Sequence, residues 1–200
     1  ILLKCENLQH VGAFKFRGAS NAVMMLGDGA ESGVCTHSSG NHAQALALAA
    51  KLRGVPAYIV MPRTAPRVKV MGVESHGAEI TFCEPNLDAR ESTAAEIIER
   101  TGAALIHPYD NPDVIAGQGT ASMELFEQAG ALDAIIAPVG GGGLMSGTSI
   151  ATRALFPDTR IIGAEPEGAD DAARSLEAGE LLLQTGPDTI CDGLLTSMSE

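Results

Sequence analysis

The 200-residue sequence has few aromatic side chains and few positive charges. Aromatic residues make up 4% of it, tryptophan is absent, and 13 Lys and Arg residues stand against 25 Asp and Glu residues, which gives a formal net charge of -12. A strongly acidic chain repels polyanions such as nucleic acids. We therefore expect a small-molecule partner and no nucleic acid.

Paired cysteines and long apolar runs are also lacking. Cysteines at positions 5, 35, 83 and 191 show no CxxC spacing, which indicates neither a zinc site nor a disulfide framework. We expect four buried, reduced thiols in a cytoplasmic protein. The longest apolar candidate, residues 134–145, is interrupted by Pro138 and four glycines, so it is too short for a membrane span and we expect no membrane partner.

What the sequence does contain is an alternation of short apolar runs with segments of helical period. This pattern predicts βαβ units around parallel sheets, an α/β fold. The expected strands are residues 33–37, 57–62, 79–83, 104–108, 133–139 and 160–165. The expected helices are residues 41–53, 64–77, 88–102, a segment from about Ile115, and 144–156.

A run of four glycines, in "PVGGGGLMSG" (138–147), follows one of the apolar strands and precedes a helix. Backbone N–H groups and the positive end of a helix then point at one spot, which favours a phosphate; the alternative is a flexible turn. No lysine follows Gly143 or Gly147, so a Walker A loop is excluded. A loose GxGxxxG pattern, with Glu165 at the end of the next strand, leaves a dinucleotide-binding protein as a rival.

A second strand-to-helix junction, "THSSGNHAQA" (36–45), is polar. One Ser or Asn there is an ordinary helix N-cap. Four adjacent groups, Ser38, Ser39, Gly40 and Asn41, are more than a cap needs, and they suit a carboxylate or a cofactor oxygen. A histidine in the first helical turn, such as His42, is more often a packing or capping residue than a base.

The stretch "GAFKFRG" (12–18) places Lys15 between two phenylalanines and next but one to Arg17. Aromatic neighbours and a fixed positive charge should lower the pKa of the lysine and favour its attack on a carbonyl. The alternative is an ordinary surface or anion-binding lysine. A lysine nucleophile, a polar loop and a phosphate cradle together are the parts that pyridoxal phosphate requires.

Five motifs carry a resemblance to a known family. They are "KCENLQHVGAFKFRGASNA", "SSGNHAQALALAAKLRGVPAYIVMP", "HPYDNPDVIAGQGT", "PVGGGGLMSG" and "GAEPEGADD". They occur in this order, and the resemblance runs over essentially the whole chain. The chain resembles the fold type II pyridoxal-phosphate enzymes, specifically the serine racemase and serine/threonine dehydratase group. The resemblance implies pyridoxal 5'-phosphate as the cofactor.

The same resemblance implies roles for individual residues. Lys15 would be the lysine that binds the cofactor aldehyde, and Ser39 would be the base on the opposite face of the cofactor in racemases. The implied cofactor-binding residues are Phe14, Lys15, Asn41, Gly140, Gly141, Gly142, Gly143 and Leu144. The implied substrate-binding residues are Ser38, Ser39, Gly40, Asn41 and His42. A divalent cation, magnesium or calcium, is implied at Glu165, the carbonyl of Ala169 and Asp171, the alternative for these acids being a solvated loop.

The family fold has a large and a small α/β domain with the cofactor in the cleft between them. On this chain the resemblance implies a large domain from residues 1–32 and 111–200 and an inserted small domain from residues 33–110. In the family a C-terminal portion supplies a serine or threonine to the pyridine nitrogen. We do not find that portion, and we expect this chain to be a fragment of a longer protein that forms a homodimer.

The activity implied is a pyridoxal-phosphate-dependent dehydratase, an ammonia-lyase that converts L-serine or L-threonine to a 2-oxo acid and ammonia. Ser39 permits serine racemisation as a second activity without proving it. Three alternatives stay open at this point: a threo-3-hydroxyaspartate ammonia-lyase, a β-replacement synthase of the same fold, and a dinucleotide-binding protein. The sequence does not rank serine, threonine and 3-hydroxyaspartate as substrates.

Overall fold

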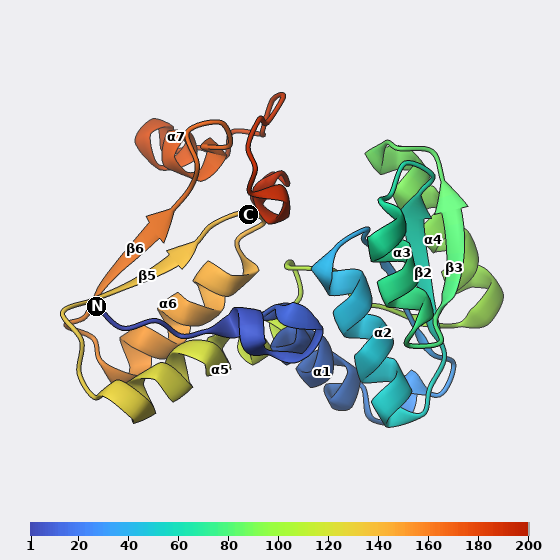
Figure 1. Ribbon diagram of the computed structural model, residues 1–200, viewed down its shortest axis with the longest axis horizontal. Helices are drawn as coiled ribbons and strands as arrows, with labels where there is room; N and C mark the ends of the chain where they lie inside the picture. The colour runs from blue at the N-terminus through green and yellow to red at the C-terminus, as the bar shows by residue number, and fades with distance from the viewer. Residues whose placement is uncertain (200) are drawn as a thin grey trace. The chain divides into compact units, whose positions relative to one another are not determined.

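The structure, a computed structural model, describes residues 1–199. The chain divides into two compact units that meet in the sequence at Gly117 and Gln118 (Figure 1). Each unit contains its own parallel strands, so the α/β fold predicted from the sequence is confirmed. The assignment of residues 33–110 to an inserted domain and the rest to a large domain stays a prediction.

The first unit is built on a four-stranded sheet with the order β3-β2-β1-β4, in which every neighbouring pair is parallel. Its strands are β1 (Val34–His37), β2 (Ala57–Pro62), β3 (Glu79–Cys83) and β4 (Ala104–Leu105). Its crossover helices are α2 (Asn41–Arg53), α3 (Arg67–Glu74) and α4 (Leu87–Thr101). Because the strands are parallel, their carboxyl ends lie on one edge of the sheet, where ligands of open α/β sheets bind.

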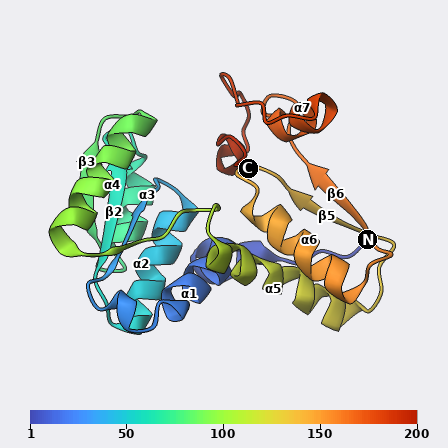
Figure 2. The ribbon, with the colours of Figure 1, turned by 180° about the vertical axis from the view of Figure 1, so that it is seen from behind.

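Alternate residues of these strands feed two separate cores. Val34, Ile59 and Met61 pack with α2, whereas Cys35 and Val60 pack with α4. Burying both faces explains why the strands read as nearly continuous apolar runs in the sequence. Figure 2 shows this unit from behind.

The N-terminal part of the chain places Lys15 in the same unit. It comprises the short helices η1 (Glu6–Leu8), η2 (His10–Gly12) and η3 (Gly27–Ala30) and the longer helix α1 (Lys15–Met25). The small residues Ala19, Ala22 and Val23 of α1 are fully buried in the core shared with α2. Lys15 is therefore the first residue of a helix that the core holds firmly.

The second unit contains the parallel pair β5 (Ala134–Pro138) and β6 (Arg160–Ala164), connected by α6 (Gly143–Leu155). The long helix α5 (Pro112–Ala129) enters this unit at Gln118, and a Cβ on Gly119 would lie 2.9 Å from the carbonyl oxygen of Gly147. The two helices thus cross with their backbones almost touching, which only glycine allows. Helix α7 (Asp171–Ala178) and the short helix η4 (Asp192–Leu194) complete the unit.

Three elements differ from the sequence-based prediction. The strand expected at 104–108 ends at Leu105: the Ile106 N–H still donates to Cys35 in β1, but the Ile106 carbonyl faces His42 and the Pro108 carbonyl accepts from Lys15. Helix α5 begins at Pro112 rather than near Ile115, because the Asn111 side chain caps it by accepting from two backbone N–H groups. Helix α7 was not predicted.

The expectation of four buried cysteines is wrong for two of them. All four are free thiols, but Cys5 and Cys191 are exposed, since each lies outside the strands and helices that face a core. Cys35 and Cys83 are buried, and burial raises the pKa of the Cys35 thiol to about 11. Within residues 1–199, no helix combines the length and apolar character that a membrane crossing would need.

Candidate active site

Lys15 stands at the N-terminal end of α1 with its amine turned into the protein. Its Nζ atom donates a hydrogen bond to the carbonyl oxygen of Pro108 at 2.7 Å. The same atom lies 5.4 Å from the centre of the Phe14 ring and 5.8 Å from that of Tyr109. Burial lowers the pKa of Lys15 from 10.5 to about 8. The neutral, nucleophilic amine is therefore far more populated near neutral pH than in a free lysine.

The direction of this pKa shift was predicted from the sequence, but only one of the two expected causes, the aromatic surroundings, is found. Arg17 was expected to supply the repelling charge, yet its guanidinium is paired with the Glu6 carboxylate through Nε–Oε2 at 2.8 Å and Nη2–Oε1 at 2.9 Å. A bidentate pair largely cancels the field of the arginine. Loss of water around the Lys15 amine lowers its pKa instead.

The polar loop follows β1 and leads directly into α2. Ser38, Ser39 and Gly40 are half-buried, Asn41 is exposed, and Ser38 Oγ accepts from the Gly40 N–H at 3.4 Å. Gly40 is the N-cap of α2, and within residues 1–199 no side chain caps the helix there. The first N–H groups of α2 are consequently available to a ligand oxygen.

His42 differs from its neighbours in the loop because it is 2% exposed. Its Nε2 lies 3.2 Å from the carbonyl oxygen of Ile106, and its Nδ1 has no partner among residues 1–199. Burial, helped by the charge of Lys15, lowers the pKa of His42 to about 3. The ring is therefore neutral, and its Nε2–H can donate to the carbonyl oxygen of Ile106, two residues before Pro108.

Two further histidines, His37 and His107, lie at this edge of the sheet. His107 lies edge-on to both Tyr109 and His37, with ring centres 4.7 and 5.7 Å apart, and its Nδ1 accepts from the Asp110 N–H. Burial lowers the pKa of His37 and of His107, so both rings are held towards the neutral form. Sequence reasoning did not assign a role to Pro108 or Tyr109, although the motif "HPYDNP" that contains them was part of the resemblance.

The glycine run of the second unit forms the turn between β5 and α6, as predicted. Gly142 is the N-cap of α6 with a φ of 96°, a backbone region that favours glycine. Gly143 and Leu144 are in the first turn of α6, and within residues 1–199 no side chain caps this helix end. An uncapped helix N-terminus behind a loop without Cβ atoms is suited to a phosphate group.

Residues near the end of the chain lie against this loop, which sequence reasoning missed. Ser199 Oγ donates to the carbonyl oxygen of Gly141 at 3.3 Å. A Cβ on Gly140 would lie 3.3 Å from the carbonyl oxygen of Gly193. Residues near positions 193 and 199 therefore pack against the glycine loop.

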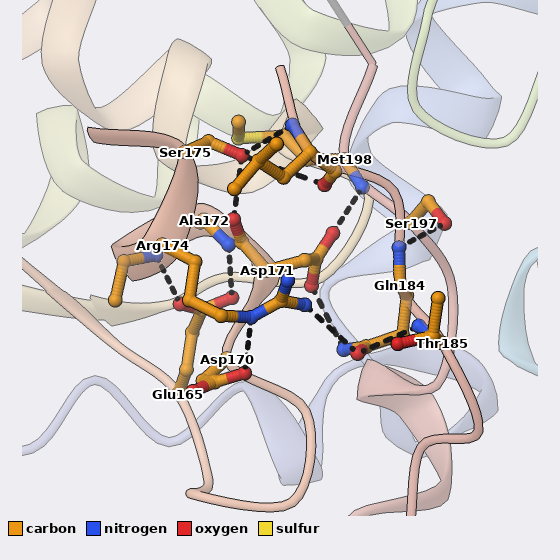
Figure 3. A network of polar contacts seen from close by, with 12 residues as sticks. Glu165, Asp170, Asp171, Ala172, Arg174, Ser175, Gln184, Thr185, Ser197 and Met198 are labelled. Carbon is orange, nitrogen blue, oxygen red and sulfur yellow. Dashed lines mark hydrogen bonds and ion pairs between the residues drawn. The ribbon is translucent and has the colours of Figure 1, made fainter. Parts of the chain in front are cut away.

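The acids assigned to a cation carry protein hydrogen bonds (Figure 3). Glu165 accepts from the N–H groups of Ala172 and Ala173 at 3.1 and 2.8 Å, so it caps α7. Asp171 is 1% exposed and accepts from Gln184 and Met198. Within residues 1–199 no group of three or more His, Cys, Asp or Glu side chains could hold a metal ion. Any cation would share these carboxylates with the donors already present.

Known proteins match the chain over its whole length. Residues 1–200 match the family described as pyridoxal-phosphate dependent enzyme. The chain is 53% identical to a β-hydroxyaspartate dehydratase of Paracoccus denitrificans, covering 100% of this chain and 64% of that protein. A serine racemase of maize matches with a TM-score of 0.95 and 49% identity, over 98% of this chain and 60% of that one.

A threonine deaminase of Solanum lycopersicum matches with a TM-score of 0.90 and 38% identity, over 96% of this chain and 53% of that one. The chain thus spans between 53% and 64% of the length of these three proteins. A family match over all 200 residues agrees with a buried lysine in one unit and a glycine cradle in the other. The chain belongs to the pyridoxal-phosphate dependent enzyme family.

Proposed function

We propose that the protein containing this chain is a pyridoxal-phosphate-dependent ammonia-lyase of hydroxy amino acids. The single observation that carries the proposal is the buried amine of Lys15, held by Pro108 and with its pKa lowered to about 8. Such an amine is suited to bind an aldehyde covalently and afterwards to accept a proton from carbon. The net reaction converts L-serine to pyruvate and ammonia, or L-threonine to 2-oxobutyrate and ammonia.

The family resemblance assigns parts of the cofactor to residues of each unit. Lys15 would bind the aldehyde, Phe14 would pack on the ring and Asn41 would bind the ring hydroxyl. The phosphate would be held by the backbone N–H groups of Gly140, Gly141, Gly142, Gly143 and Leu144. When bound, pyridoxal phosphate supplies a ring system that accepts the electron pair left when an amino acid loses its α-proton.

The remaining roles belong to the chain's own side chains. Lys15, once free of the aldehyde, would take the α-proton of the substrate at Nζ. The polar loop would hold the substrate carboxylate through Ser38, Ser39, Gly40, Asn41 and His42. Proton return from the Ser39 hydroxyl would give the D-amino acid, so we propose serine racemisation as a side activity.

3-Hydroxyaspartate is the second candidate substrate. The observation that favours it is the similarity to a β-hydroxyaspartate dehydratase, 53% identical over the whole chain. Comparing kcat/KM for L-serine, L-threonine and L-threo-3-hydroxyaspartate ranks the candidates. A β-replacement synthase would instead be revealed by thioether or thiol products from sulfide and an activated serine.

A dinucleotide-binding protein is less well supported. That reading needs the Glu165 carboxylate for a ribose, and the carboxylate instead caps α7 through two backbone N–H groups. Tight NAD binding that ignores a Lys15→Ala change would still favour it.

The cation, the cellular location and the assembly are each proposed from a separate observation. Glu165, the carbonyl of Ala169 and Asp171 are hard oxygen ligands within seven residues, and a carboxylate oxygen that accepts one hydrogen bond keeps a second lone pair. We propose that magnesium or calcium binds there, and calorimetric titration of metal-free protein tests it. Four free thiols suit a reducing compartment, so we propose a cytoplasmic location. A homodimer rests on family resemblance and is tested by sedimentation.

The decisive experiment is the visible absorption spectrum of the full-length protein after addition of pyridoxal phosphate. We expect the wild type to show a visible band that borohydride reduction removes, and we expect Lys15→Ala to lack this band. Only the wild type should release ammonia from hydroxy amino acids. A wild type without such a band would contradict the proposal.

A further inference from the structure

The chain makes a tight turn shortly before Lys15, and this turn contains an unusual residue. Val11 has a φ of 57° and a ψ of 15°, and within residues 1–199 no other residue except glycine has a positive φ. A β-branched side chain in this left-handed region crowds the following carbonyl group, so the conformation costs free energy. Such strain persists only where the surrounding structure imposes it, and it gathers at functional sites.

The core of the first unit supports Val11 in this conformation. The Val11 side chain is half-buried and packs against the apolar core that α1 and α2 share. The Gly12 N–H donates to the carbonyl oxygen of Gln9 at 2.9 Å, which closes the turn around Val11. The ring of His10 lies edge-on to that of Phe16 in α1, with ring centres 4.7 Å apart. The turn is therefore attached both to the core and to α1.

The turn also sets the point at which α1 begins. Gly12 is left-handed as well, with a φ of 69°, and Ala13 is extended. Phe14 is the N-cap of α1, and within residues 1–199 no side chain caps this helix end. A helix without a capping side chain takes its starting point from the residues before it. Here those residues are Val11 and Gly12, and the helix that follows them begins with Lys15.

The contacts of the Lys15 amine depend on this starting point. Its Nζ lies 2.7 Å from the carbonyl oxygen of Pro108 and 5.8 Å from the centre of the Tyr109 ring. Pro108 and Tyr109 follow β4 and are positioned by the sheet, whereas Lys15 is positioned by α1. Hydrogen bonds to an oxygen weaken beyond about 3.2 Å. A small shift at the start of α1 would therefore break the contact and admit water to the amine.

We propose that Val11 is a positioning residue for the reacting lysine: its side chain, anchored in the core, imposes the left-handed turn that starts α1, and the turn keeps the Lys15 amine against Pro108 and away from water. The packing of Val11 in the core offsets the strain of the turn. This inference rests on the proposed function, because the position of the amine matters for the reaction only if Lys15 binds the cofactor.

The test compares Val11→Gly with Val55→Gly. Val55 is also half-buried against the same core and also adjoins a left-handed glycine, Gly54, but its own φ is negative. Val11→Gly loses core contacts and relieves the strain, whereas Val55→Gly loses core contacts without any relief. In the cofactor-free full-length protein, we therefore expect the thermal midpoint to fall less in Val11→Gly than in Val55→Gly.

The pKa of Lys15 is the readout that a purely structural role would not change. Competitive acetylation at a series of pH values, followed by mass spectrometry of the peptide that contains Lys15, reports the pKa of this one amine. We expect a pKa of about 8 in the wild type and in Val55→Gly, and a rise of about one pH unit in Val11→Gly, because water then reaches the amine. His42 and His107 face the charge of Lys15, but burial lowers the pKa of both below 6.5, so neither changes its charge in this pH range.

Val11→Ala keeps the test decisive if Val11→Gly does not fold. Alanine retains the Cβ atom and with it part of the contact with the core. We therefore expect the pKa of Lys15 to rise in Val11→Ala as well, by a smaller amount than in Val11→Gly.

Two outcomes overturn the inference. One is an unchanged pKa of Lys15 in both Val11→Gly and Val11→Ala. The other is an equal rise in Val55→Gly, because any loss of core packing would then be enough to expose the amine. Failure of the proposed function looks different: the wild type would take up no pyridoxal phosphate, while acetylation would still report the pKa of Lys15.

Discussion

The two candidate binding regions of the chain, around Lys15 and at the glycine loop, differ in the property on which binding would depend. Around Lys15 the chemistry lies in side chains, and it depends on removing water from an amine that would otherwise stay charged. At the glycine loop the chemistry lies in the backbone, and it depends on having no side chain at Gly142, where φ is 96°. Binding at Lys15 should therefore depend on how polar the surroundings of the amine are, and binding at the glycine loop on the size of the residue at position 142. Three changes test this contrast.

Lys15→Met should have the largest effect. Because burial lowers the folded-state pKa from 10.5 to about 8, the lysine destabilises the native state below pH 8 and ceases to do so above pH 10.5. The variant should be more stable than the wild type at pH 7, by about 3 kcal/mol, and should lose this advantage near pH 11. Urea unfolding of cofactor-free protein measures both values. The exposed Lys51→Met is the control, and equal stability changes in the two variants would contradict the prediction.

Gly142→Ala should have the next largest effect, on cofactor binding rather than on stability alone. Alanine in a left-handed conformation costs about 1–2 kcal/mol. Its methyl group would lie 3.6 Å from Met198 Cγ, so the strain falls on the turn whose backbone N–H groups would bind the phosphate. Gly130, with a φ of 74° and open space at the Cβ position, is the matched control. Both alanine variants should lose similar stability in thermal unfolding. Affinity for pyridoxal phosphate should fall about tenfold or more in Gly142→Ala alone, and an equal fall in Gly130→Ala would remove the distinction.

His42→Gln should have the smallest effect, and it decides what the histidine does. Burial lowers the folded-state pKa of His42 from 6.5 to about 3, so the native state binds fewer protons than the unfolded state between these values. Stability should fall as the pH decreases from 7 to 5, and the wild type should lose about 2 kcal/mol more than the variant. A KM increase for the amino acid, without this difference in stability, would instead support substrate binding by His42.

The regular parts of the fold could be predicted because local signals agree with the packing. The segment from β1 through α2 to β2 shows apolar strands, a helix with a buried face, and Gly54 with a φ of 79° at the helix end. Helix α7 was missed because its polar first turn is held by contacts with Glu165, Gln184 and Met198, which lie outside the helix. Strand β4 was overextended because the partner of the Pro108 carbonyl is 93 residues away.

The site shows the same limit. The residue types at Lys15, the polar loop and the glycine run pointed to pyridoxal phosphate, and the family is confirmed. The expected contribution of Arg17 to the low pKa of Lys15 was wrong, because the sequence does not show that Glu6 neutralises Arg17. The hydroxyl of Ser199 at Gly141 was likewise invisible, since 58 positions separate the two residues. The residue types of the site could be predicted from the sequence, whereas the contacts between residues far apart in the chain could not.

The hydrogen bond from Lys15 to Pro108 also has a consequence for synthesis on the ribosome. Lys15 is translated early, while its acceptor is translated 93 residues later, just after β4, the strand that pairs with β1. Until then the nascent chain carries a hydrated lysine of ordinary basicity, which reacts slowly with cellular aldehydes near neutral pH. The low pKa of Lys15 is therefore a property of the folded chain, because it depends on burial by residues from both ends of this unit.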